Sequence, residues 1–370
     1  MILNGVSLLN YKNLQEVNIS FSPKINCFIG SNGMGKTNLL DAVYYLSFCK
    51  SAVTASDSSN IMHDAPFFML QGCYQSDSGI ASEVSCGLKR GEKKQFRRDG
   101  KLYERLSDHI GSVPLVMVSP ADSELIAGGS EERRRFMDVV ISQYDKEYLG
   151  ALIRYNRALQ QRNALLRGER EPDSEMMQLI EEMMVDEAMV INRGRKAFID
   201  ELVPVFERFH STIACGGEVV SLKYRSHMND GDLLEQLRLS RADDYRLGHT
   251  SKGVHRDELT MLLGGYPLRR EGSQGQNKTF LVSLKLAQYD FLRSKGGEMP
   301  LLLLDDIFDK LDSRRVEQII ALVAGEGFGQ IFITDVNREH IDCILERVSG
   351  DYRLFEVQGG HVELLKSREV

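Results

Sequence analysis

The sequence lacks several features that mark common classes of protein. It has no tryptophan, and its 370 residues carry a net charge of −7, so it lacks the basic excess of a protein that coats nucleic acid. No apolar run exceeds the length of a strand, and the N-terminus has no basic region followed by an apolar core, so neither a membrane segment nor a signal peptide is expected. The cysteines show no paired spacing, which argues against a structural zinc site and suits a reducing compartment. They are Cys27, Cys49, Cys73, Cys86, Cys215 and Cys343. We therefore expect a cytoplasmic protein with one large or two modest domains and no membrane partner.

The sequence does contain an octapeptide of the form G-x-x-x-x-G-K-[ST], at 30–37. It follows an apolar run, 25–29, that predicts a short buried strand. In such a loop the glycines let successive backbone N–H groups point at an anion, and the helix predicted to begin near Lys36 adds the positive end of its dipole. The pattern predicts a site for the triphosphate of ATP. Its nucleotide-binding residues would be Gly30, Ser31, Asn32, Gly33, Met34, Gly35, Lys36 and Thr37.

A second apolar run, 301–304, ends in Asp305 and Asp306. A buried strand that ends in a carboxylate predicts the Walker B arrangement, in which Asp305 would hold Mg²⁺ beside Thr37, directly or through water. Asp306 falls where many such ATPases place the acid that polarises the attacking water. Asp306 and Lys36 are therefore the predicted catalytic residues. A core strand that meets a loop would show the same pattern, but the upstream P-loop favours the catalytic interpretation.

Between these motifs, the segment 271–278 precedes a strongly periodic stretch, 279–293, that predicts a helix. The segment resembles a degenerate ABC-type signature in which Gln274 replaces the first glycine of Ser-Gly-Gly-Gln. Ser273, the Gly275 backbone and the helix N-terminus could still meet a γ-phosphate, and Gln276 ends the motif. A polar N-cap before a helix would look the same, and the position before the Walker B strand favours the signature.

An ABC-type signature cannot reach the P-loop of its own head, because the two lie on different lobes. The predicted active unit is therefore a head-to-tail pair, with each ATP between Lys36 of one subunit and Ser273 of the other. Nucleotide binding and dimerisation would then be one linked equilibrium. The segment 309–312 is similar to the D-loop that crosses to the partner head.

Together the motifs resemble the RecF family of bacterial recombination mediators, which is related to the SMC and Rad50 ATPases. The resemblance covers nearly the whole chain. It rests on LLNYKNL at 8–14, GSNGMGKTNLLDA at 30–42, SPAD at 119–122, RRRFMD at 133–138, GVHRDEL at 253–259 and SQGQ at 273–276. It implies an α/β fold: an ABC-type ATPase head of the SMC/Rad50-like P-loop type with an inserted α-helical arm domain. It also implies an ATP-dependent homodimer that binds DNA in recombinational repair and replication maintenance, and that acts with RecO and RecR to help load RecA at gapped DNA.

The resemblance also bears on particular positions. Residues similar to Lys12 and Asn13 approach the nucleotide in related heads, although a turn at a strand edge would account for them nearly as well. No Q-loop glutamine is evident near 119–120, and Thr334-Asp335 stands where a switch histidine is expected. These departures favour a slow ATPase that uses hydrolysis as a timer, and the resemblance implies that DNA stimulates it. The alternative is an ABC-type ATPase subunit of another DNA-associated or transport complex.

The composition of the middle of the chain differs from that of its flanks. Residues 1–128 alternate short β-rich runs with turn signals, and strand and helix patterns return from 249 to 370. Residues 129–248 are dominated by helical periodicity, at 147–166 and 175–209, with a break at 168–172. We predict two parts of an ATPase head, 1–128 and 249–370, separated by a helical arm domain at 129–248.

Because the whole chain is acidic, any DNA contact must come from a local basic patch. The first candidate lies within 89–105, where Asp99-Gly100 predicts a hairpin. Its proposed DNA-binding residues are Lys93, Lys94, Arg97 and Arg98. The second candidate is the arm, with Arg154, Arg157, Arg162, Arg167 and Arg170. Solvated faces with ordinary ion pairs would explain either patch, and the sequence leaves open which of the two is the main DNA contact. Neither patch offers a base-reading code, so contact with the sugar-phosphate backbone is expected.

Overall fold

The computed structural model describes residues 1–168, 173–309, 311–325, 327–347 and 350–369. These residues form two compact units. The first unit comprises 1–122, 209–216 and 274–370, and the second comprises 123–208 and 217–273. The chain thus leaves the first unit and returns to it, as an inserted segment must. The division into domains at 128/129 and 248/249 stays a prediction.

The first unit contains a mostly parallel sheet that carries the P-loop. Its strand order is β15-β14-β3-β13-β12-β8, and only β15 runs antiparallel to its neighbour. The central strands are buried along their whole length, as expected for a sheet covered on both faces. The bounds are β3 Ile25–Ile29, β8 Leu115–Val118, β12 Leu301–Asp305, β13 Ile331–Asp335, β14 Tyr352–Gln358 and β15 His361–Arg368.

A second sheet of the first unit is antiparallel, with the order β2-β1-β4-β5-β6-β7. The predicted hairpin at Asp99-Gly100 is confirmed: both residues have positive φ, 50° and 75°, and Arg98 pairs with Lys101 across the turn. Alternate residues of β5 are buried, which is typical of a sheet with one covered face. The bounds are β1 Ile2–Tyr11, β2 Leu14–Ser20, β4 Phe67–Gln75, β5 Ala81–Lys89, β6 Gln95–Arg98 and β7 Lys101–Leu102.

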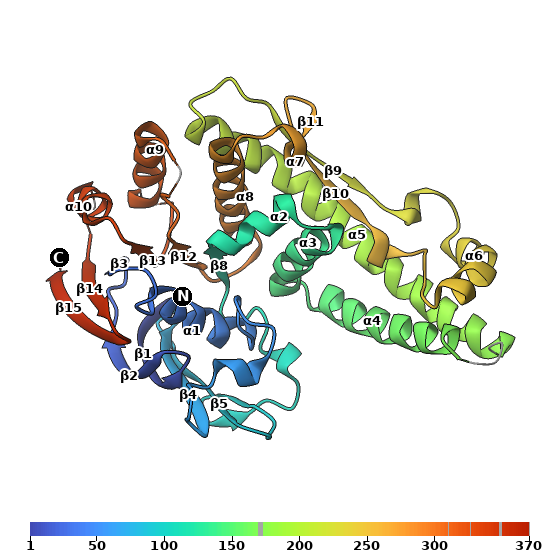
Figure 1. The fold of residues 1–370 in the computed structure, drawn as a ribbon, viewed down its shortest axis with the longest axis horizontal. Coiled ribbons are helices and arrows are strands. Elements are labelled where there is room, and N and C mark those ends of the chain that lie inside the picture. Colours follow the sequence, from blue (N-terminus) through green and yellow to red (C-terminus); the bar gives the residue numbers. More distant parts are fainter. Residues whose placement is uncertain (169–172, 310, 326, 348–349, 370) are drawn as a thin grey trace. The chain divides into compact units, whose positions relative to one another are not determined.

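Helix α1, Lys36–Phe48, contacts strands of both sheets (Figure 1). It begins where the sequence predicts, directly after the P-loop, and ten of its thirteen residues are buried. Burial on most of its circumference explains why this helix has only a weak amphipathic pattern. The other long helices of this unit are α8 Gln274–Lys295, α9 Ser313–Ala324 and α10 Arg338–Arg347.

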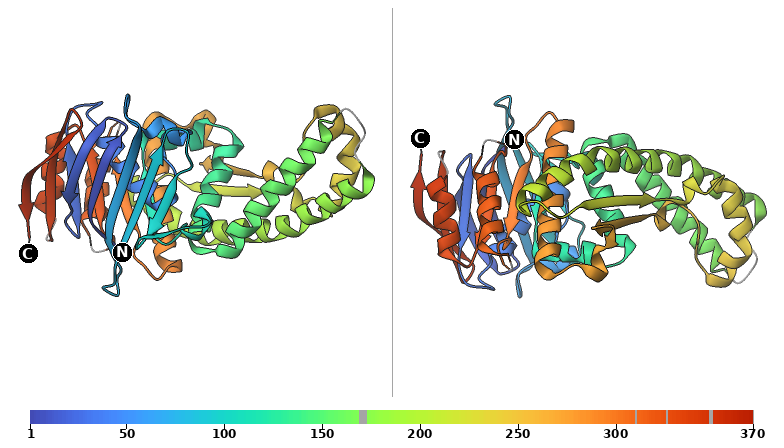
Figure 2. Two further views of the ribbon diagram at one scale, coloured as in Figure 1. Left: turned by 90° about the horizontal axis from the view of Figure 1, so that it is seen from below. Right: turned by 90° about the horizontal axis from the view of Figure 1, so that it is seen from above.

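The second unit is built on long helices, as predicted for the middle of the chain. Figure 2 shows α4 and α5 running beside each other, and Arg154 of α4 forms an ion pair with Glu187 of α5. The helices are α2 Glu124–Ala127, α3 Ser130–Tyr144, α4 Lys146–Leu166, α5 Ser174–Ile213, α6 Leu233–Leu247 and α7 Leu268–Glu271. The end of α5 belongs to the first unit. Of the predicted break at 168–172, residues 169–172 lie outside the described residues.

This unit also contains a small sheet that the sequence did not predict. Strands β9 Val220–Arg225, β10 Glu258–Leu263 and β11 Tyr266–Pro267 pair antiparallel in the order β11-β10-β9. The strands that pair in its centre are separated by α6, so their association is not a local property of the sequence. Among the described residues, no helix combines the length and apolarity that a membrane crossing requires.

Candidate nucleotide-binding site

The P-loop connects the end of β3 to the start of α1. At two of its glycines, neighbouring atoms lie close to where a side chain would begin. A Cβ on Gly30 would lie 2.3 Å from the carbonyl oxygen of Val357. Gly35 has a φ of 116°, and a Cβ there would lie 3.1 Å from Oδ1 of Asn13. The close approach at Gly30 and the positive φ at Gly35 therefore both favour glycine, and the loop can curl tightly at these positions.

The side chain of Lys36 folds back over this loop. Its Nζ donates hydrogen bonds to the carbonyl oxygens of Gly30, at 2.6 Å, and Ser31, at 3.0 Å. Burial lowers the pKa of the Lys36 ammonium, while the nearby carboxylates of Asp306 and Asp305 act in the opposite direction. The ammonium is thus held inside the curve of the loop.

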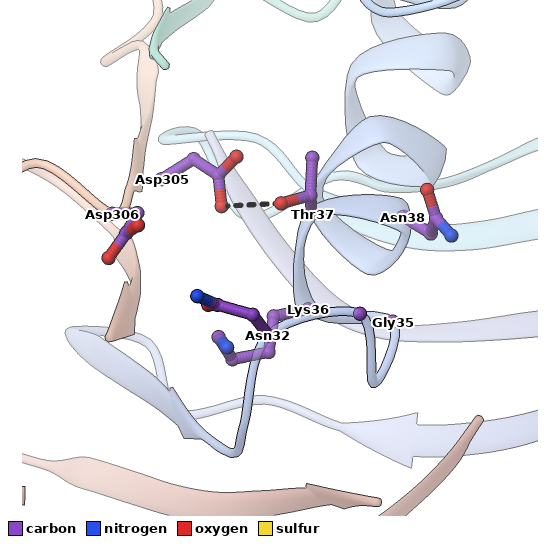
Figure 3. A pocket seen from close by; sticks show the side chains of 8 residues that line it. Asn32, Gly35, Lys36, Thr37, Asn38, Asp305 and Asp306 are labelled. Carbon is purple, nitrogen blue, oxygen red and sulfur yellow. Dashed lines mark hydrogen bonds between the residues drawn. The ribbon is translucent and has the colours of Figure 1, made fainter. Parts of the chain in front are cut away.

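The Walker B strand β12 brings Asp305 to the first turn of α1 (Figure 3). The Thr37 hydroxyl donates to Oδ1 of Asp305 at 3.1 Å. The Thr334 hydroxyl, from the end of the neighbouring strand β13, donates to the same oxygen at 2.7 Å. Burial raises the pKa of Asp305, and the two hydroxyl donors oppose that rise. The residue found where a switch histidine is expected therefore contacts the Walker B carboxylate.

Asp306 follows the strand in a left-handed backbone conformation, with a φ of 50°. Its backbone N–H donates to the Thr334 hydroxyl at 3.1 Å, and its carbonyl accepts from Nζ of Lys278 at 3.3 Å. Burial raises the pKa of Asp306, and the carboxylate of Asp335 adds to that rise. Asp335 is in turn hydrogen-bonded to Nδ1 of His340 at 2.8 Å. A strained backbone and a raised pKa are both typical of functional positions.

The P-loop and the Walker B residues line one hollow. Its lining residues are Asn32, Gly33, Gly35, Lys36, Thr37, Asn38, Asp305 and Asp306. Of the predicted residues of the loop, Gly30, Ser31 and Met34 are not among them. The backbone and sulfur of Met34 instead accept hydrogen bonds from Gly360 and Gly359, in the turn between β14 and β15.

Lys12 and Asn13 lie at the turn between β1 and β2 and differ in their contacts. Nδ2 of Asn13 donates to the Gly33 carbonyl at 3.3 Å, and its Oδ1 accepts from Asn38 at 2.7 Å. Nζ of Lys12 instead donates to Asp41 of α1 at 2.5 Å. Asn13 thus contacts the P-loop directly, whereas Lys12 contacts the helix that follows it.

The predicted signature lies at the start of α8. Gly275 and Gln276 belong to its first turn, and Ser273 precedes the helix. The carbonyl of Gly275 accepts a hydrogen bond from the buried Thr279 hydroxyl at 2.9 Å. Gly275 and Gln276 belong to the same unit as the P-loop, yet neither is among the residues that line the hollow.

Comparisons with known proteins agree with this geometry. A family model described as an AAA ATPase domain matches residues 1–166. The chain is 60% identical over 369 residues to the DNA replication and repair protein RecF of Bacteroides fragilis, and covers 100% of both sequences. It is 62% identical over 363 residues to the RecF protein of Phocaeicola vulgatus, with 98% of each chain covered. The chain belongs to the RecF family.

Solved structures confirm the predicted fold. The structure described as the recombination mediator protein RecF-ATP in the RecFOR pathway matches with a TM-score of 0.88 and 28% identity, covering 99% of this chain and 98% of that one. The Smc head domain of Pyrococcus furiosus matches with a TM-score of 0.61 at 16% identity, covering 100% of this chain and 96% of that one, which shows a shared fold. The predictions of an ABC-type head and of an ATPase are thus confirmed.

The four basic residues predicted to bind DNA do not present the same surface. Lys93 precedes β6 and is exposed, and so is Arg97 within it. Arg98 is partly exposed, with its nearest charged partner, Asp99, at 4.0 Å. Lys94 is turned inward, and its Nζ donates to Asp57 at 2.7 Å and to the Cys49 carbonyl at 2.5 Å. Lys94 is therefore engaged within the protein. Of the other predicted residues of this basic ribbon (residues 89–105), Lys93 and Arg97 are exposed and Arg98 is partly exposed.

The arm arginines are also unequal. Arg162 is fully buried and bonds to Glu181 and Asp244, so it does not offer its charge to a DNA surface. Arg154 is paired with Glu187, and Arg157 is exposed. Nε of Arg167 donates to the Gly248 carbonyl at 3.0 Å. Arg170 lies outside the described residues.

Three residues of the site were missed by the sequence predictions, and one of them is Asp335, whose carboxylate acts on Lys36 and Asp306. Asn38 lines the hollow and is bonded to Asn13, and Thr334 is bonded to Asp305. Asn38 directly follows the octapeptide, which was a usable signal. The role of Thr334 depends on β13 lying beside β12. The sequence of one strand does not predict which strand will pair with it.

Proposed function

We propose that this chain is an ATP-dependent DNA-binding protein of recombinational repair and replication maintenance, in which ATP binding drives head-to-tail dimerisation and slow hydrolysis reverses it. The observation that carries the proposal is the meeting of Lys36, Thr37, Asp305 and Asp306 at one hollow. Membership of a family whose relatives are named DNA replication and repair protein RecF supports the biological context.

The site suits ATP with Mg²⁺ as its cofactor. The Lys36 ammonium already donates to two carbonyl oxygens inside the loop. Phosphate oxygens that bind there could therefore accept hydrogen bonds from an ammonium that is already in position. The described residues contain no cluster of three or more His, Cys, Asp or Glu side chains suited to a metal. A magnesium ion needs only a few protein ligands when phosphates and water supply the others, and Thr37 and Asp305 would provide them. The ion would neutralise charge on the β and γ phosphates.

Each residue of the hollow would then have a distinct role. Lys36 would hold the β and γ phosphates, and Asn13 would keep the P-loop in shape through the Gly33 carbonyl. Asp306 would orient and polarise the attacking water. Burial and the Asp335 carboxylate raise the pKa of Asp306, which makes it a better proton acceptor than an ordinary aspartate.

The dimer would complete each site from the second subunit. Ser273, Gly275 and Gln276 would contact the γ-phosphate held by the partner's P-loop. Gly275 and Gln276 belong to the same unit as the P-loop, and neither lines its hollow, which supports a contact with the partner's site. ATP binding and association would be linked by mass action.

DNA binding would use the sugar-phosphate backbone and the exposed residues of the basic ribbon. The related solved structure is that of a RecF protein described as a recombination mediator in the RecFOR pathway. By extension, this chain would act in the cytoplasm with RecO and RecR to help load RecA at gapped DNA.

Sedimentation velocity would test the proposal. The wild type should be a monomer alone and a dimer with a slowly hydrolysed ATP analogue, more so with gapped duplex DNA. Ser273→Arg should bind the analogue and remain a monomer, because a bulky cation displaces the signature from the partner's γ-phosphate. Glu271→Arg, at an exposed position two residues away, is the matched control and should dimerise. A Ser273→Arg protein that dimerises like the wild type would contradict the trans site.

A further inference from the structure

A fully buried carboxylate, Asp41, joins the P-loop helix to its surroundings. Asp41 lies on α1 one turn after Thr37 and accepts from the Tyr11 hydroxyl at 2.7 Å and from Nζ of Lys12 at 2.5 Å. It also accepts from the Ser51 hydroxyl and the Ala52 N–H, both at 2.7 Å. A buried charge satisfied by four donors resists rearrangement. The turn between β1 and β2, the helix and the segment after it are therefore held together.

The turn between β1 and β2 also contacts the P-loop. Asn13 follows Lys12 directly, donates to the Gly33 carbonyl at 3.3 Å and accepts from Asn38. A change in the P-loop backbone on nucleotide binding would therefore act on the same turn that holds Asp41.

The C-terminal end of α1 contacts the basic ribbon. Cys49 ends α1 in a left-handed conformation, and its carbonyl accepts from Nζ of Lys94 at 2.5 Å. The same Nζ donates to Asp57 at 2.7 Å, and the Tyr45 hydroxyl of α1 donates to the other oxygen of Asp57, also at 2.7 Å. The ammonium lies 5.5 Å from the centre of the Tyr45 ring. A cation at the carbonyl end of a helix is favoured by the helix dipole.

Lys94 belongs to the ribbon, between the exposed Lys93 and the strand that carries Arg97. The ribbon is thus fastened to the C-terminal end of α1, while the P-loop occupies the N-terminal end. The helix between them has thirteen residues, a span of about 20 Å. The helix is held in its middle by the buried Asp41 and at its C-terminal end by Lys94, and its N-terminal end carries the P-loop that Asn13 contacts. A stiff helix held in this way can transmit a small displacement from one end to the other.

We propose that Lys94 is a positioning residue that couples DNA binding on the ribbon to nucleotide binding at the P-loop. The inference rests on the proposed function, which supplies the two ligands. Lys94 is not itself a phosphate contact. It acts through the Cys49 carbonyl and Asp57, so that a ribbon drawn toward DNA and a P-loop closed on a nucleotide favour one arrangement of α1.

Coupling of this kind is reciprocal. If the ATP analogue tightens DNA binding by a given factor, DNA must tighten analogue binding by the same factor, which commonly lies between about 5 and 150. Lys94→Met should reduce the factor toward one in both directions while the analogue affinity without DNA stays within about twofold of the wild type. Lys94→Arg keeps a cation for both acceptors and should retain coupling.

Two further variants make the test specific. Lys93→Met removes the exposed neighbouring charge. It should weaken DNA binding and make the salt slope shallower by about one, with coupling intact. Asp57→Asn removes the acceptor of Lys94, so it should lower coupling, and the double variant Lys94→Met, Asp57→Asn should lower it little further. A Lys94→Met protein with the wild-type coupling factor, or one that only copies the salt response of Lys93→Met, would overturn the inference.

Hydrogen exchange without DNA separates this inference from the proposed function. In the wild type and in Lys93→Met, the ATP analogue should change amide exchange within residues 89–98 of the ribbon, and in Lys94→Met that change should disappear. This exchange response does not depend on DNA. If the response is present and DNA binding fails, the proposed function is contradicted, while the connection from the P-loop through α1 and Lys94 to the ribbon stands. If amide exchange in the wild-type ribbon is the same with and without the ATP analogue, the proposed role of Lys94 is wrong.

Discussion

Buried charges in the two units are arranged in different ways. In the second unit Arg162 lies between Glu181 and Asp244, and Arg241 also bonds to Glu181. Two guanidinium groups there form ion pairs with two carboxylates, so the positive and negative charges are equal in number. At the strand ends of the first unit, the carboxylates of Asp305, Asp306 and Asp335 act on the ammonium of Lys36, and the ammonium of Lys278 acts on Asp306 as well. Three carboxylates there face two ammonium groups.

The carboxylates of that first-unit site are Asp305, Asp306 and Asp335, and the first two have raised pKa values. In a balanced set, each buried charge has a partner of opposite sign within the chain, and the set stabilises the fold. An unbalanced set leaves negative charge that a bound cation would neutralise, and such a set is typical of a functional site. The difference separates the two kinds of site without reference to any motif.

The largest effect is expected at Asp306. Asp306→Asn should lower the rate of ATP hydrolysis by about 10²–10⁴-fold, the usual contribution of a general base, and should accumulate the ATP-bound dimer. Asparagine accepts a left-handed backbone readily, so the φ of 50° can be kept. Single-turnover hydrolysis and sedimentation with ATP would measure both. An Asp306→Asn protein that hydrolyses ATP at the wild-type rate would remove this residue from the chemistry.

The balanced site should respond in stability instead. Arg162→Met leaves Asp244 buried without its cation and should lower the free energy of unfolding by about 3–5 kcal/mol. Arg193→Met breaks an exposed ion pair with Glu147 at 3.4 Å and should cost less than about 1 kcal/mol. Urea unfolding followed by circular dichroism would compare them. Equal destabilisation by the two variants would contradict the structural role of Arg162.

Sequence patterns located the unbalanced site but not the balanced one. Lys36, Thr37, Asp305 and Asp306 follow from motifs in which the residues are local in sequence or end a recognisable strand. The sequence places Arg162 among the arm arginines of a possible DNA surface, because a basic residue within a helical pattern looks the same whether it is exposed or paired in the interior. Only the packing of α4, α5 and α6 reveals its partners.

The same limit applies to strand pairing and to the ribbon. The order of the parallel sheet, with β13 between β3 and β12, brings Thr334 to Asp305, and no local signal encodes it. The hairpin at Asp99-Gly100 was predictable because its turn chemistry is local. The inward direction of Lys94 was not, since it depends on Asp57 and the end of α1.

The exposed ribbon should give a moderate effect. Replacing Lys93, Arg97 and Arg98 by Glu should weaken duplex binding and make the slope of log affinity against log salt shallower by about one for each phosphate that is no longer bound. ATP binding, measured alongside, should be retained. Arg157→Glu tests the arm. If that variant reduces the salt slope and the ribbon variant does not, the DNA site belongs to the arm.

The smallest effect is the pH dependence of stability. The pKa of Asp306 is higher in the folded protein than its ordinary value of 3.8, so the folded state holds this proton more tightly. This carboxylate therefore disfavours folding at neutral pH, and the disadvantage fades as the pH falls through the folded pKa toward 3.8. Asp306→Asn should match or slightly exceed the wild type in stability near pH 7, by less than about 1 kcal/mol, and lose that advantage in acid. Thermal unfolding of both proteins across that pH range would show it.

The most direct measurement pairs ATP calorimetry with urea unfolding on Lys36→Met and Arg162→Met. Lys36→Met should weaken ATP binding by about 100-fold or more, because hydrogen bonds to a charged group contribute about 1.5–3 kcal/mol each, and its stability should remain near that of the wild type. Arg162→Met should show the reverse, with lowered stability and ATP affinity close to that of the wild type below the unfolding transition. A Lys36→Met protein that binds ATP as tightly as the wild type would contradict the assignment of the unbalanced charges to nucleotide binding.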